Sequence, residues 1–127
     1  MITLDHVGFA VADYERSKAF YEKALAPLGL KLFMELSGAS AGFGKDDGDG
    51  VVFFIDAHGE PVRGRLHIAL RAESRPQVDA FHAAAIEAGG TDNGAPGVRA
   101  TYHADYYGGY VLDPDGNNIE AVCHQPG

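Results

Sequence analysis

The chain has 127 residues, 46% of them hydrophobic, and its 18 acidic against 10 basic side chains give a net charge of -8. This length suits one compact domain with its own core, so we expect a single domain over residues 1–127. The acidic balance argues against nucleic acid as a partner, because phosphates require a basic face. No apolar run approaches the roughly 20 residues of a membrane span. With Cys123 as the one cysteine, we expect a cytoplasmic protein without an internal disulfide.

The first half of the chain predicts one helix among several strands. Asp13 is a helix-capping residue, and the apolar residues of Tyr14–Ala26 have helical spacing. Pro27 and Gly29 end that helix. Around it the sequence predicts strands over Ile2–Val11, Leu30–Leu36 and Val51–Ile55, a short strand or turn over Gly38–Gly44, and an acidic, glycine-rich loop over Lys45–Gly50.

The second half predicts the same order of elements, beginning near Arg65. Leu66, Ile68 and Leu70 alternate with His67, which predicts a strand with His67 on the opposite face from the apolar residues. Ser74 caps the second helix. After Gly89-Gly90 come a loop over Asn93–Gly97, a strand or strand pair over Thr101–Leu112, a turn over Asp113–Gly116 and a final strand over Asn118–His124.

The two halves are repeats of each other. A shift of 61 positions lays His6-Val7-Gly8-Phe9 over His67-Ile68-Ala69-Leu70. Two helices are too few for a doubly wound parallel sheet. We therefore expect an α+β fold of two tandem βαβββ modules, about residues 1–60 and 61–127, related by a pseudo-twofold axis and forming curved mixed sheets around a central cleft.

The repeat also predicts a metal site. Aligning Gly50 with Gly116 lays Phe54 over Glu120, so the matched inner positions are His6, Phe54, His67 and Glu120. Two imidazoles and one carboxylate suit a divalent ion such as iron, manganese, nickel or zinc, and they leave coordination positions open for a substrate. A lone strand histidine is more often a hydrogen-bonded core residue, but the matched pair with a carboxylate favours metal ligation.

A dense aromatic segment follows between Tyr102 and Tyr110. His103 is a candidate acid or base, because the pKa of histidine lies close to working pH. Tyr107 is a candidate hydrogen-bond donor to a developing oxyanion. Tyr102, Tyr106 and, from the first module, Phe54 are expected to contact the substrate. The alternative for this segment is an aromatic patch at a subunit interface or a solvated rim.

The chain resembles the vicinal oxygen chelate superfamily, which holds glyoxalases, bleomycin-resistance proteins and extradiol-type dioxygenases. The resemblance covers nearly the whole chain. It rests on Leu4–Val11, Ser17–Leu25, His67–Leu70 and above all Leu112–Glu120, where an Asp-Pro-Asp-Gly turn precedes a strand with Glu. It implies paired βαβββ modules, a metal-bearing cleft with His6, His67 and Glu120 as ligands, and a homodimer.

One departure from the pattern bears on activity. Phe54 stands where glyoxalases of this superfamily typically have a fourth ligand, so the three-ligand set favours a dioxygenase-like site. We expect a metal-dependent enzyme that acts on a small oxygenated molecule. Two alternatives remain open at this point: a non-catalytic binding or resistance protein on the same scaffold, and a metal that only stabilises the fold.

Overall fold

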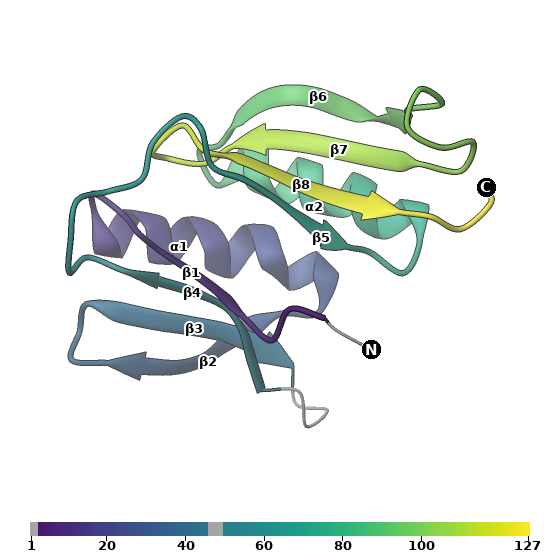
Figure 1. Cartoon of the computed structure of the whole chain (residues 1–127). Coiled ribbons are helices and arrows are strands. Elements are labelled where there is room, and N and C mark those ends of the chain that lie inside the picture. Colours follow the sequence, from purple (N-terminus) through teal and green to yellow (C-terminus); the bar gives the residue numbers. More distant parts are fainter. Residues whose placement is uncertain (1–2, 46–49) are drawn as a thin grey trace.

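The computed structural model describes residues 3–45 and 50–127, which form two similar modules (Figure 1). The first holds β1 (Val7–Ala10), α1 (Tyr14–Leu25), the short 3-10 helix η1 (Ala26–Leu28), β2 (Lys31–Leu36), β3 (Ser40–Lys45) and β4 (Gly50–Asp56). The second holds β5 (His67–Arg71), α2 (Arg75–Glu87), β6 (Thr91–Val98), β7 (Tyr107–Leu112) and β8 (Asn118–Cys123).

Each module has one four-stranded mixed sheet, and the two sheets have the same topology. Their strand orders are β1-β4-β3-β2 and β5-β8-β7-β6. In both, the pair that includes the first strand is parallel and the other pairs are antiparallel. The predicted α+β fold of two tandem βαβββ modules is therefore confirmed.

The strand register settles which residues of the two modules correspond. Gly8 of β1 pairs with Phe54 of β4, and Ala69 of β5 pairs with Glu120 of β8. Gly8 and Ala69 are themselves matched by the shift of 61 positions. Phe54 and Glu120 consequently occupy the same place in the two sheets, as the sequence alignment predicts.

Both helices begin at the predicted caps. The Asp13 carboxylate accepts a hydrogen bond from the Arg16 amide, and the Ser74 hydroxyl accepts one from the Gln77 amide. Each cap thereby satisfies a backbone donor that the first helical turn leaves free. The short helix η1, which follows α1, ends at Gly29. The φ of 81° at Gly29 is a left-handed conformation that glycine adopts without strain.

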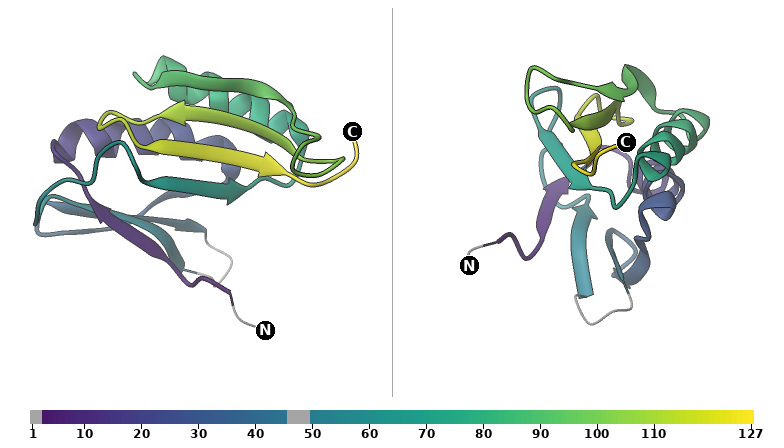
Figure 2. Two further views of the ribbon diagram at one scale, coloured as in Figure 1. Left: turned by 45° about the horizontal axis from the view of Figure 1, so that its top comes forward. Right: turned by 90° about the vertical axis from the view of Figure 1, so that its right-hand side faces the viewer.

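The two helices lie together on one side of the sheets and enclose a single core with them (Figure 2, right). In the first module, Phe9, Tyr21 and Phe53 meet through edge-to-face or tilted ring contacts. The second module contributes apolar side chains to the same cluster, among them Phe81 and Ile119. The opposite face of each sheet is left free of helices and carries the candidate functional residues.

The Asp113–Gly116 turn joins the second module to the first. The buried Asp113 carboxylate accepts hydrogen bonds from the Tyr21 hydroxyl at 2.5 Å and from the Asn117 amide at 2.9 Å. Asp115 accepts a hydrogen bond from the amide of Ala12, just before α1. The most specific motif of the sequence therefore has a structural role, since its carboxylates tie α1 to the turn before β8.

Several expected element boundaries need correction. Residues Asn93–Gly97, expected to be a loop, lie within β6, because pairing with β7 outweighs their turn-forming side chains. The strand expected over Thr101–Leu112 begins only at Tyr107, and β1 is shorter than the expected Ile2–Val11. The acidic loop falls on residues 46–49, outside the described residues. No helix in the described part of the chain is long and apolar enough to cross a membrane.

Candidate functional site

A buried carboxylate and a histidine form the centre of the candidate site. Glu120 in β8 is fully buried, and its Oε1 lies 2.8 Å from Nε2 of His67 in β5. The His67 side chain is half exposed and so forms the open side of the pair. A buried carboxylate is costly without polar partners, and Glu120 finds them in the side chains that line a cavity.

The sheet register brings these residues to one face. Glu120 pairs with Ala69 of β5 on one side and with Tyr110 of β7 on the other. Because side chains alternate along a strand, Tyr106, Gly108 and Tyr110 face Glu120. Ile119, Ala121 and Cys123 point into the core instead, where each is fully buried.

Tyrosines form the remaining walls of the cavity, which has a volume of about 290 Å³ and is lined by His67, Tyr102, Tyr106, Tyr110 and Glu120. The Tyr106 hydroxyl donates a hydrogen bond to Oε2 of Glu120. The Tyr110 hydroxyl is buried without a hydrogen-bond partner among the described residues. Burial raises the pKa of both tyrosines, with the Glu120 contact adding to the rise for Tyr106. Both hydroxyls therefore stay protonated at neutral pH; that of Tyr106 donates to Glu120, and that of Tyr110 is available to donate to a ligand.

Gly108 lies beneath this group and leaves room for it. A Cβ at this position would come within 3.1 Å of the Tyr106 ring and 3.2 Å of Glu120 Oε2 and of the Tyr110 hydroxyl. Such contacts are closer than real Cβ atoms usually make. The missing side chain is thus a condition for the three polar groups to gather, and sequence analysis did not single it out.

His6 and Phe54 lie in a second cavity, on the first module. Its volume is about 330 Å³, and Phe33, Met34 and Val51 contribute to its largely apolar lining. Nδ1 of His6 lies 2.7 Å from an Asp5 carboxylate oxygen, and the ring is more than half exposed. The four matched positions are therefore brought together in two pairs, His67 with Glu120 and His6 with Phe54.

The candidate ligands meet the requirements of a metal ion only in part. Within residues 3–45 and 50–127, no group of three or more His, Cys, Asp or Glu side chains is arranged to hold one. The His67–Glu120 pair itself fits two neighbouring ligands, since metal–ligand bonds of about 2.1 Å place such ligands about 3 Å apart. Among the described residues, one chain thus offers two candidate ligands with suitable spacing.

His103 and Tyr107 lie away from the cavity lining. Nδ1 of His103 accepts a hydrogen bond from the Asp105 amide, and its ring contacts His124. Tyr107 points to the helix side of the sheet, where its hydroxyl donates to Asp79 of α2 at 2.6 Å. The tyrosines whose side chains face Glu120 are Tyr106 and Tyr110.

The fold and this pair of cavities define a class of protein. The family model described as Glyoxalase/Bleomycin resistance protein/Dioxygenase superfamily matches residues 3–121, and the chain belongs to this superfamily. No curated protein matches the chain.

Solved structures share the fold over nearly the whole chain. A glyoxalase/bleomycin resistance protein from Albidiferax ferrireducens T118 is 34% identical, with a TM-score of 0.77 over 95% of this chain and 97% of that one. A possible glyoxalase from Bacillus cereus is 28% identical, with a TM-score of 0.67 over 97% and 100%. A lactoylglutathione lyase from Agrobacterium tumefaciens is 18% identical, with a TM-score of 0.66 over 93% and 90%, and shares the fold alone.

Proposed function

We propose that the protein is a metal-dependent enzyme of the glyoxalase or dioxygenase type, acting on a small oxygenated organic molecule. The observation that carries this proposal is the buried Glu120 in contact with His67 at the floor of a tyrosine-lined cavity. The fold gives no reason to bury this carboxylate, in contrast to Asp113, which anchors a turn. A metal ion held by His67 and Glu120 supplies that reason.

We assign the third ligand to His6 of a second copy of this chain. The Asp5 carboxylate contacts Nδ1 of His6, which leaves Nε2 available for a metal. Carboxylate–histidine pairs at metal sites commonly have this arrangement. Around His6 the sheet face is apolar and open, with Phe33 44% and Met34 41% exposed. A twofold dimer that covers this face with the second module of the partner brings His6 to the His67–Glu120 pair, twice per dimer.

The tyrosines then bind and orient the substrate. A divalent metal in this site supplies Lewis-acid polarisation of neighbouring substrate oxygens. The Tyr110 hydroxyl, protonated and unpartnered among the described residues, donates a hydrogen bond to one of these oxygens. Tyr106 holds Oε2 of Glu120, fixing the orientation of the carboxylate. Tyr102, 68% exposed, lines the same cavity and offers its ring to the substrate.

Elemental analysis of the untagged protein is the direct test. We expect near-stoichiometric iron, manganese, nickel or zinc in the wild type and its loss in His67→Ala, because an imidazole ligand is removed. His82→Ala is the matched control, since His82 pairs with Asp92 away from the cavity. Absence of metal in the wild type, also after incubation with each ion, contradicts the proposal.

Mixing two defective variants tests the shared site. Refolding His6→Ala together with Glu120→Ala lets the intact His6 of one copy meet the intact His67 and Glu120 of the other. Random pairing restores about one quarter of the sites, measured as bound metal and as turnover. A site built within one chain regains nothing on mixing, and that result excludes the contribution of a second copy.

The alternative is a binding or resistance protein that sequesters a small molecule. The tyrosine-lined cavity and the apolar face around Phe54 favour it, since both offer aromatic surface to a ligand. It predicts tight binding that survives a chelator and His67→Ala. The enzyme proposal predicts that either treatment abolishes turnover while the fold persists.

A further inference from the structure

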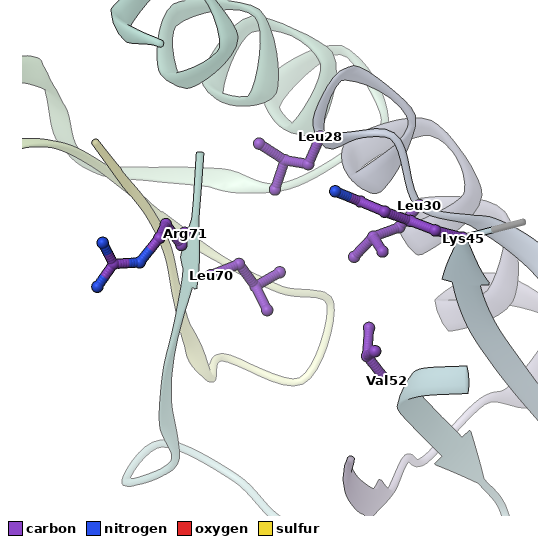
Figure 3. Close-up of a pocket in the computed structure, with 6 residues that line it drawn as sticks. All are labelled: Leu28, Leu30, Lys45, Val52, Leu70 and Arg71. Atoms are coloured by element: carbon purple, nitrogen blue, oxygen red, sulfur yellow. The ribbon is translucent and has the colours of Figure 1, made fainter. Parts of the chain in front are cut away.

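A third pocket lies at the seam between the two modules, apart from both cavities described above. Its volume is about 210 Å³, and we call it the seam pocket; it is lined by Leu28, Leu30, Lys45, Val52, Leu70 and Arg71 (Figure 3). The first four residues come from the first module and the last two from β5. None of them lines the cavity around Glu120.

The walls of the seam pocket are aliphatic, but a cation reaches into it. Figure 3 shows the Lys45 side chain extending between the leucines with its ammonium group directed into the pocket, whereas the Arg71 guanidinium points outward. The stem of Lys45 passes beside Gly29, where an added Cβ would lie 3.6 Å from Lys45 Cε, an ordinary van der Waals distance.

The Lys45 ammonium has no carboxylate partner among residues 3–45 and 50–127. An ammonium group among aliphatic side chains is stabilised by an anion, because its partial loss of water has to be compensated. A single cation inside the pocket suits one negative charge. Arg71, the other cation of the lining, points outward, so Lys45 is the cation directed at a ligand inside the pocket.

We propose that the seam pocket is a second ligand site, for a small amphipathic carboxylate. Its alkyl part lies between Leu28, Leu30 and Leu70, and its charged group pairs with Lys45. The site binds without chemistry and is independent of the metal site. Because its walls come from both modules, the bound ligand contacts both.

Methyl-detected NMR with hexanoate as the probe tests the proposal. We expect saturable shifts of the methyl groups of Leu28, Leu30, Val52 and Leu70. Acetate lacks the alkyl part and hexanol lacks the charge. Each is therefore expected to bind with an affinity at least about tenfold lower than that of hexanoate. Equal binding of hexanoate and hexanol, or shifts confined to the cavity around Glu120, overturns the proposal.

Three variants separate the role of Lys45 from general charge effects. Lys45→Met keeps the length of the stem and is expected to weaken hexanoate binding about tenfold, the effect of losing one charge-assisted hydrogen bond. Lys45→Arg retains binding. Lys23→Met removes the same charge from an exposed position of α1 and leaves binding unchanged. Unchanged binding in Lys45→Met, with the fold verified by its methyl spectrum, refutes the site.

Discussion

At the scale of single residues, the environment of Glu120 decides what the candidate site can do. One carboxylate oxygen contacts His67 and the other accepts a hydrogen bond from Tyr106. Removing a residue that hydrogen-bonds to a metal ligand typically lowers metal affinity by about 10–100-fold. Tyr106 is such a residue under the proposed function, although it contributes no ligand atom itself.

Tyr106→Phe is therefore expected to weaken metal binding about tenfold or more, measured by competition with a chelator of known affinity. The neighbouring Tyr107→Phe is the matched control, because that hydroxyl contacts Asp79 on the helix side. It is expected to leave metal affinity unchanged. Equal effects of the two variants would show that Tyr106 does not act through Glu120.

Gly108→Ala is expected to disturb the site and to lower the free energy of unfolding by about 1–3 kcal/mol, the usual cost of overpacking. The added Cβ meets Tyr106, Tyr110 and Glu120 within 3.2 Å. Gly59→Ala is the control, since nothing lies within 4 Å of a Cβ there. Thermal melting and metal content are the measurements, and equal behaviour of the two variants contradicts the crowding at Gly108.

The sequence allowed part of this site to be predicted. Tyr102 and Tyr106 were expected near the substrate and do line the cavity. Tyr107, expected to donate to the substrate, lies on the helix side of the sheet, and alternation along β7, counted from Tyr110 opposite Glu120, places it there. The separation of His6 from His67 could not be predicted, because a repeat fixes equivalence between modules and not their distance in space.

At the scale of elements, carboxylates connect strands, turns and helices. Tyr21→Phe is expected to lower the free energy of unfolding by about 1–3 kcal/mol, because the buried Asp113 carboxylate loses a donor. Tyr14→Phe provides the comparison. Glu35, its acceptor, is partly exposed and keeps Lys18 as a partner, so we expect a smaller loss. Urea unfolding measures both, and an equal or larger loss in Tyr14→Phe contradicts this ranking.

The contact between α1 and β2 also predicts a pH dependence. Hydrogen bonds from Tyr14 and then Lys18 lower the pKa of Glu35 below its ordinary value of 4.5. A carboxyl group with a lowered folded-state pKa stabilises the protein above its unfolded pKa, and this contribution disappears as the pH falls through the folded value. Acidification below 4.5 is thus expected to reduce the melting temperature less in Glu35→Gln than in the wild type, and identical pH profiles would contradict this.

The elements themselves were largely predictable, because both modules repeat the same caps and strand patterns. Asp13 and Ser74 cap the helices as expected. β6 was missed since Gly94, Pro96 and Gly97 usually break regular structure, and here pairing with β7 on one side outweighs their local preference. Proline is tolerated in an edge strand such as β6, and the register gives Pro96 no partner in β7.

At the scale of the whole molecule, the open face of the first module is the surface on which the proposed dimer depends. Phe33→Glu places a charge on it and is expected to raise the dimer dissociation constant about tenfold or more, with loss of metal, measured by analytical ultracentrifugation. Ile86→Glu is the control, since Ile86 is similarly exposed but belongs to α2. A monomeric wild type, or dissociation in both variants, argues against this face.

The irregular composition of β6 has a consequence for the behaviour of the protein in concentrated solution. β6 is an edge strand of its sheet, and an edge strand offers unpaired backbone groups to any other extended chain. Pro96 removes one of these donors, and two register shifts along the β6–β7 pair break the regular spacing that a further strand would need. We therefore expect the features that made this strand hard to recognise to limit fibrillar self-association as well.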